Sequence, residues 1–442
     1  MRILVLNLPF EKPIIRRYSC SYYAHGFLYE PHELLRVATI LKEGKNEILF
    51  LDCIAEKKNV TSTIEYIKKK RIDLIITMLG IDFVTEDYKT ITTIKKNCRV
   101  KIVGISYIAS LFPEMFKNLD AILNKFFEEK IANAKNETTL DRFLKKLKID
   151  VKEKNPDIIK KVDRSFLNFK DYTELLTSKC AFIYFGFGCP FKCNYCIRSY
   201  DLNEYKIRSK EFVFDELKTI FLEGYRNVRI MDDNFTLNSN FLMELSEFLK
   251  KENIHLNFYG LSRIDLLNDK TIELLRRINV KRLYIGLETF KQDMQKYYDK
   301  NIKIDIEKFT EIFKKLRSSK IETGVWLLYH PIKDRKEEIL DWINILLKLN
   351  PDFVNLSIIT PYPNTLFFEM EKSNFVFSIN PFKSEFSITN YEDVEKEFFR
   401  RYLFHPKNVL KHIKLAIRNP NLPAELLLDL LSKKRTQRKD LI

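Results

Sequence analysis

Short apolar runs alternate with helical patterns along most of this chain, and this alternation restricts the fold more than any other feature. Over residues 1–150, apolar segments such as ILVLNL, EILFLD and DLIITMLG are each followed by a helical pattern. Parallel strands must be joined by a crossover, which is usually a helix. The alternation therefore predicts an α/β domain with a Rossmann-like, doubly wound parallel sheet, of the type that binds nucleotides or cofactors.

A second alternation follows a stretch without any period. Residues 151–178 carry scattered charges and predict a linker. Beyond them, six apolar strands alternate with helical patterns: AFIYFGF, NVRIMDD, HLNFYGLS, RLYIGLE, TGVWLLYH and FVNLSIIT. Six βα units in succession predict a partial (β/α)6 TIM-like barrel over residues 179–380. Residues 381–442 show only helical patterns, and we expect a small helical C-terminal region with an exposed basic tail, SKKRTQRKD.

Three of the seven cysteines fall within eight residues, directly after the first strand of the predicted barrel. The run is Cys189-Pro-Phe-Lys-Cys193-Asn-Tyr-Cys196, and Gly186 and Gly188 precede it. Thiolates are soft donors that suit iron, and these spacings let one loop hold three corners of a cubane while the fourth iron stays open. Glycine lets the backbone approach a molecule bound there. A structural zinc site is the main competitor, but it needs four ligands and no His or Cys follows closely.

The segment GCPFKCNYC resembles the CxxxCxΦC signature of the radical S-adenosylmethionine superfamily, with Tyr195 as the aromatic residue. The resemblance covers roughly residues 180–370 and implies a 4Fe-4S cluster on Cys189, Cys193 and Cys196. It also implies that S-adenosylmethionine binds the open iron and is cleaved by one electron to a 5′-deoxyadenosyl radical. We therefore expect an enzyme that abstracts hydrogen from an unreactive carbon.

Polar residues end nearly every predicted strand of the barrel, where ligands of parallel barrels bind. Gly286 and Glu288 in YIGLET resemble the family's GxE segment, whose carboxylate contacts the cofactor, and Asp232–Thr236 resembles its DDxFT form. Arg263 could hold a carboxylate in a bidentate pair. Each of these side chains, and His330 after the fifth strand, could instead be structural. The candidate cofactor-binding residues are Gly188, Tyr195, Asp232, Asp233, Arg263, Gly286 and Glu288.

The order of an α/β domain, a barrel and a helical tail resembles the superfamily branch with an amino-terminal cobalamin-binding-type domain. The segment TPYPNT resembles that branch's PYPGT, with Asn364 in place of a glycine and able to take a positive φ. This resemblance implies cobalamin at the strand ends of residues 1–150, and methyl transfer or C–C bond formation or cyclisation as the reaction. The DxHxxG motif is missing, so cobalamin binding stays open. Cys20, Cys53 and Cys98 leave open a methylthiotransferase-like enzyme with a second cluster.

The formal net charge of +16 identifies no ligand by itself. For an enzyme it suits docking of an acidic electron donor, a ferredoxin or flavodoxin. The alternative of another class is a basic nucleic-acid- or membrane-surface-binding protein with a structural metal site, with nucleic acid the less favoured partner. We expect a small-molecule, lipid or peptide substrate, which no residue identifies. No apolar stretch reaches the length of a membrane span, and an odd number of cysteines disfavours disulfides, so we expect a cytoplasmic protein.

Overall fold

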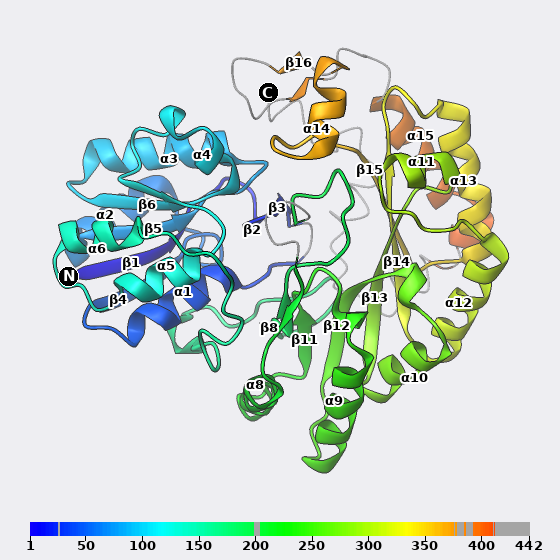
Figure 1. Ribbon diagram of the computed structural model, residues 1–442, viewed down its shortest axis with the longest axis horizontal. Helices are drawn as coiled ribbons and strands as arrows, with labels where there is room; N and C mark the ends of the chain where they lie inside the picture. The colour runs from blue at the N-terminus through cyan, green and yellow to red at the C-terminus, as the bar shows by residue number, and fades with distance from the viewer. Residues whose placement is uncertain are drawn as a thin grey trace. The chain divides into compact units, whose positions relative to one another are not determined.

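The computed structural model describes residues 1–24, 27–198, 204–374, 376–377, 384–385, 392–409 and 411. The chain divides into two compact units (Figure 1). Unit 1 comprises Met1–Phe182 and Lys206–Leu222, and unit 2 comprises Ile183–Tyr205 and Glu223–Ile442. The predicted basic tail and the last predicted helix lie outside the described residues. Within the described ranges, no helix combines the length and the apolar character needed to cross a membrane.

Unit 1 contains a five-stranded parallel sheet in the order β4-β1-β5-β6-β7. This is the 2-1-3-4-5 order of doubly wound, flavodoxin-like folds, so the predicted class is confirmed. The strand order reverses between β1 and β5, and ligands of such sheets bind at the carboxyl ends of the strands at that point. The strands are β1 (Arg2–Asn7), β4 (Glu47–Asp52), β5 (Leu74–Met78), β6 (Lys101–Ile105) and β7 (Ala121–Leu123).

The sequences of these strands explain their position. β1 and β5 are almost entirely apolar and buried, as expected of parallel strands covered on both faces by helices. An antiparallel hairpin, β2 (Ile14–Arg17) and β3 (Cys20–Tyr23), is inserted after the carboxyl end of β1. The helices are α1 (His32–Lys42), α2 (Val60–Lys70), α3 (Val84–Asn97), α4 (Tyr107–Leu111), α5 (Phe127–Ala134), α6 (Leu140–Leu147) and α8 (Lys210–Leu222).

The second large sheet has six strands in the order β15-β14-β13-β12-β11-β8. Neighbours in this sheet are also neighbours along the chain, and the sheet is open, which confirms the predicted partial (β/α)6 barrel. Figure 1 shows α9, α10, α12 and α13 along one side of it. The strands are β8 (Cys180–Ile183), which carries the boundary between the units, β11 (Asn227–Ile230), β12 (Asn257–Arg263), β13 (Val280–Glu288), β14 (Glu322–Tyr329) and β15 (Phe353–Ile358).

Helices connect these strands and continue after the last one. They are α9 (Ser239–Lys251), α10 (Asp269–Arg277), α11 (Gln292–Tyr297), α12 (Ile306–Ser318), α13 (Lys336–Leu349), α14 (Leu366–Glu371) and α15 (Glu392–Leu403). The helical pattern expected after residue 381 is therefore present in α15, which packs against α13.

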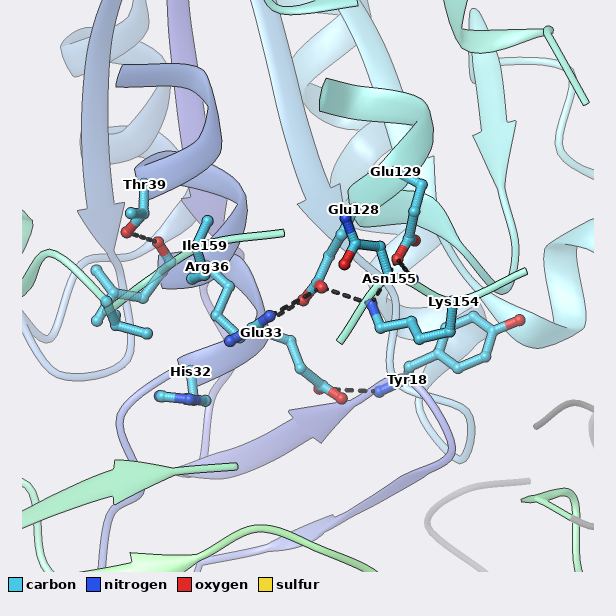
Figure 2. Close-up of polar contacts among 12 residues, drawn as sticks. Tyr18, His32, Glu33, Arg36, Thr39, Glu128, Glu129, Lys154, Asn155 and Ile159 are labelled. Atoms are coloured by element: carbon cyan, nitrogen blue, oxygen red, sulfur yellow. Dashed lines mark hydrogen bonds and ion pairs between the residues drawn. The ribbon is translucent and has the colours of Figure 1, made fainter. Parts of the chain in front are cut away.

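Residues 151–178, predicted as a linker, belong to unit 1 and are docked on it. Lys154 is buried, and its Nζ lies 2.6 Å from a carboxylate oxygen of Glu128 and 3.2 Å from one of Glu129 (Figure 2). Arg36 of α1 donates two hydrogen bonds to the same Glu128, at 2.7 and 3.0 Å. Burial alone would raise the pKa of Glu128, but the two cations outweigh it and hold that pKa well below its usual range. A buried ion network thus fixes this segment to α1 and α5.

We expect Arg36→Met to destabilise unit 1 by about 3–5 kcal/mol, because the Glu128 carboxylate would keep only one cation in a buried site. The measurement is hydrogen exchange of the α1 and α5 amides in the full chain. The control is Arg2→Met, which removes the solvent-exposed pair with Glu47 and should cost at most about 1 kcal/mol. Equal protection in Arg36→Met and the wild type would show that the network does not stabilise the unit.

Candidate functional site

The cysteine loop begins where β9 (Gly186–Phe187) ends. Gly188 has a φ of +79°, a conformation that L side chains rarely adopt, so glycine is required at this turn. Gly186 is required by packing, since a Cβ there would lie 2.7 Å from the ring of Tyr205. The two glycines flagged by the sequence therefore shape the entry into the loop.

The three cysteines of this loop are free thiols that share one electrostatic environment. Cys193 is buried, and Cys189 and Cys196 are half-buried. Burial raises the pKa of Cys189 to about 11 and that of Cys196 to about 12, and the neighbouring Asp233 and Cys193 add to both shifts. Metal coordination reverses such a shift, because a coordinating thiol is deprotonated.

Among the described residues, no three His, Cys, Asp or Glu side chains are grouped so that they could hold a single metal ion, and this includes the three cysteines of the loop. The donor set itself is three soft sulfur atoms on one loop, which is the ligand chemistry that iron–sulfur clusters use. By that criterion these residues fit such a cluster.

Asn194, between two of the cysteines, anchors the loop. Its backbone N–H donates to the carbonyl of Tyr298 at 3.1 Å, and its Nδ2 donates to the carbonyl of Tyr297 at 2.6 Å. Its own carbonyl accepts from the N–H of Phe367 at 3.0 Å. The adjacent Tyr195 packs edge-on against Tyr298, with the ring centroids 5.5 Å apart. The loop is therefore tied to the end of α11 and to the start of α14.

Arg263, at the end of β12, contacts the same loop. Its Nη1 donates to the Sγ of Cys193 at 3.7 Å, and its guanidinium lies 3.7 Å from the ring centroid of Phe191. The sequence predicted that Arg263 binds the cofactor and could hold a carboxylate in a bidentate pair; in the structure its guanidinium makes such a pair with Asp265, at 3.0 and 2.9 Å. Nη2 also donates to the carbonyl of Lys300 at 2.8 Å. Burial would lower the pKa of Arg263, but Asp265 outweighs it and raises that pKa.

Glu288 ends β13 with a φ of +67°, at a register shift in the pairing with β14. A non-glycine residue in this region is strained and often lies at a functional site. The carboxylate accepts from Nζ of Lys300 at 2.6 Å. Gly286 leaves room for this pair, because a Cβ there would lie 2.8 Å from Oε1 of Glu288. No motif in the sequence pointed to Lys300 as the partner of Glu288.

Asp232 and Asp233 follow β11 and have different partners. Asp232 is buried and accepts from the N–H of Phe185 at 2.7 Å and from the hydroxyl of Tyr205 at 3.4 Å. Asp233 forms an ion pair with Arg198 at 3.2 Å. Asp232 thus joins the ends of the neighbouring strands β8 and β11. This is the structural role that the sequence left open as the alternative to cofactor binding.

His330 also has a structural role. Its Nδ1 accepts from the N–H groups of Ile332 and Lys333 at 3.1 and 3.3 Å, which fixes the turn after β14. Nε2 lies 3.3 Å from a carboxylate oxygen of Glu371, and burial lowers the pKa of the imidazole. Asn364 has the positive φ, +65°, that its place in the TPYPNT segment predicts.

At the strand ends of unit 1, the point where the strand order reverses carries buried charges and aromatic rings. Arg16 pairs with Asp87 through two contacts of 2.7 and 2.9 Å, and both side chains are buried. Phe10 and Tyr23 are half-buried and pack edge-on against Phe83, with centroids 5.1 and 4.9 Å apart. This edge therefore carries a cluster of edge-to-face aromatic rings beside a buried ion pair.

The amino-terminal cysteines lie on separate elements. Cys53 is buried after β4 near the hydroxyl of Thr63, at 3.3 Å, and burial raises its pKa to about 12. Cys98 ends α3, and Cys20 lies in the hairpin. These three thiols therefore come from separate parts of unit 1, whereas Cys189, Cys193 and Cys196 share one loop.

Comparison with known proteins agrees with this geometry. The model of the radical SAM superfamily matches residues 183–346. The uncharacterized methyltransferase PH0819 of Pyrococcus horikoshii is 24% identical over 402 residues, which cover 85% of this chain and 84% of that protein. The hopanoid C-3 methylase of Methylococcus capsulatus is 28% identical over 192 residues, 42% of this chain and 35% of the methylase.

One solved structure shows the same fold over most of the chain. The radical S-adenosylmethionine methyltransferase TsrM from Kitasatospora setae, with cobalamin and a [4Fe-4S] cluster bound, has a TM-score of 0.64 at 15% identity. The match covers 84% of this chain and 78% of TsrM. Residues 183–346 thus match the radical SAM superfamily, and the chain has the fold of a radical S-adenosylmethionine methyltransferase whose structure contains cobalamin and a [4Fe-4S] cluster.

Proposed function

We propose that Cys189, Cys193 and Cys196 hold a 4Fe-4S cluster with one iron open to S-adenosylmethionine. When bound, the cluster supplies the electron that cleaves S-adenosylmethionine to a 5′-deoxyadenosyl radical. The observation that carries the proposal is the loop itself, which offers three thiols after a glycine turn inside the matched domain. The backbone N–H of Asn194 donates to Tyr298 and its carbonyl accepts from Phe367, which fixes the loop.

The remaining candidate residues act around the open iron in this proposal. The Glu288 carboxylate already binds an alkylammonium group, that of Lys300, which supports a contact with the amino group of the cofactor. Gly286 leaves room for the Glu288–Lys300 pair, Gly188 forms the turn into the loop, and Tyr195 and Asp232 keep the loop and the strand ends in place. Asp233, half-buried beside the thiols, is the second candidate acidic contact.

Cobalamin is the proposed cofactor of unit 1, and methyl transfer to an unactivated carbon is the proposed reaction. The half-buried rings of Phe10 and Tyr23 at the carboxyl ends of the strands offer apolar contacts to a corrin. The related methylases support methyl transfer over C–C bond formation or cyclisation. We further propose a small-molecule substrate, an acidic ferredoxin or flavodoxin as electron donor because of the net charge of +16, and a cytoplasmic location.

Anaerobic reconstitution with iron and sulfide tests the cluster. The wild type should bind about four irons per chain and gain iron–sulfur absorbance, and Cys193→Ala should lose most of both because one corner has no ligand. Cys53→Ala and Cys98→Ala are matched controls that remove a buried thiol elsewhere and should keep the wild-type iron content. Iron content that falls in these controls would support the methylthiotransferase alternative, and a wild type without iron would refute the proposal.

Adding hydroxocobalamin to the anaerobically purified protein tests the second cofactor. We expect the protein to retain cobalamin through gel filtration and, once supplied with reductant and S-adenosylmethionine, to form S-adenosylhomocysteine together with 5′-deoxyadenosine. Replacing the rings in Phe10→Ala/Tyr23→Ala should weaken cobalamin retention without changing the iron content. A loaded enzyme that forms 5′-deoxyadenosine but binds no cobalamin would remove methyl transfer through cobalamin from the proposal.

A further inference from the structure

Arg263 is the charged side chain that the structure places on a sulfur of the cysteine loop. Its Nη1 donates to Cys193 Sγ at 3.7 Å, and the stack on Phe191 holds the guanidinium against the loop. The side chain is 9% exposed, so water screens this contact weakly. The other donors of the guanidinium are committed to Asp265 and to the carbonyl of Lys300, which fix its orientation.

Of the two paired residues Arg263 and Asp265, only the arginine is seen to hydrogen-bond the sulfur of Cys193. The guanidinium touches Cys193, whereas the Asp265 side chain is 37% exposed and binds the guanidinium through Nε and Nη2. Solvent therefore screens the carboxylate more than the cation. Of this pair, the cation is therefore the member that acts on the sulfur at short range, and its Nη1 donates to that sulfur.

We infer that Arg263 is a positioning residue that raises the reduction potential of the cluster held by Cys189, Cys193 and Cys196. The inference rests on the proposed function. Hydrogen bonds to cluster sulfurs and nearby charge set the potentials of iron–sulfur centres. Reduction adds one electron from a low-potential donor to the cluster, and no bond of the protein forms or breaks. Because the reduced state carries one more negative charge, a cation and N–H donor at a ligand sulfur stabilise it preferentially.

The test is a potentiometric titration of the reconstituted full chain, with the reduced cluster detected by electron paramagnetic resonance. Arg263→Met should lower the potential by an amount that corresponds to about a tenfold change in the reduction equilibrium, which is about 59 mV for one electron. Arg263→Lys keeps the charge and should recover part of this shift. Asp265→Asn removes the compensating charge and should move the potential in the opposite direction, upward.

Arg282→Met is the matched control. Arg282 is a buried arginine of the same sheet, paired with Glu322 at 2.6 Å. Arg282 of β13 is the register partner of Tyr259 of β12. Tyr259 lies four residues before Arg263, so Arg282 is about 13 Å from Arg263 along the strand direction. Its loss should cost stability of the sheet while leaving the potential unchanged.

The outcomes separate this inference from the function on which it rests. A wild type that binds no cluster would refute the proposed function. A wild type with a cluster, together with equal potentials in the wild type, Arg263→Met and Asp265→Asn, would leave the function standing and overturn the role of Arg263. Parallel shifts of the same sign in Arg263→Met, Asp265→Asn and Arg282→Met would also overturn it, because they would report general loosening of the sheet.

Discussion

The cysteine loop has to hold three sulfur atoms in place without regular secondary structure of its own. Its shape therefore depends on hydrogen bonds from outside, and Asn194 provides them by exchanging three with residues at the end of α11 and the start of α14. A buried backbone group must find a partner, so these bonds are obligatory as well as orienting. Arg263 adds a contact from the end of β12. Each element that touches the loop enters it from the carboxyl edge of the sheet, which is why the parallel topology is a precondition for the site.

The same edge explains the unusual backbone of Glu288. In a regular strand, the Glu288 side chain would follow the alternating directions of its neighbours. Here the register shift and the left-handed backbone conformation accompany a side chain that binds Lys300. The conformation costs free energy, of the order of 1–3 kcal/mol, and a buried ion pair helps to retain it. Lys300 serves twice, since its carbonyl accepts from Arg263 while its ammonium binds Glu288. One short loop thus joins the two candidate residues of neighbouring strands.

The features that the sequence predicted correctly are those with a local or periodic signal. The βα alternation predicted both sheets, the spacing of the cysteines predicted the matched superfamily, and the replacement of glycine by asparagine predicted the positive φ of Asn364. The partners of the site residues have no such signal. Arg263 and Cys193 are 70 residues apart, and Asn194 and Tyr297 are 103 apart, so their contacts exist only once the sheet has formed.

Residues 151–178 illustrate the same limit, because their loss of period and scattered charges predict a linker. Lys154 is nevertheless buried against Glu128, which Arg36 reaches from 92 residues away. Scattered charges in a sequence suggest a solvent-exposed segment. A buried residue such as Lys154, which meets carboxylates in the interior, produces the same sequence pattern. Only the positions of α1 and α5 distinguish the two cases.

Unit 1 also shows why a missing histidine motif does not settle cobalamin binding. Among the described residues of this unit, His32 is buried, and its Nδ1 lies 2.6 Å from Glu30, which also pairs with Arg164. This imidazole is committed to the structure of the unit and is not presented at the strand ends. The same holds for Arg16 and Asp87, which satisfy each other beneath the surface. At this edge the structure places the half-buried rings of Phe10 and Tyr23, packed edge-to-face on each other and on Phe83, and these are the side chains that the proposed cobalamin would contact.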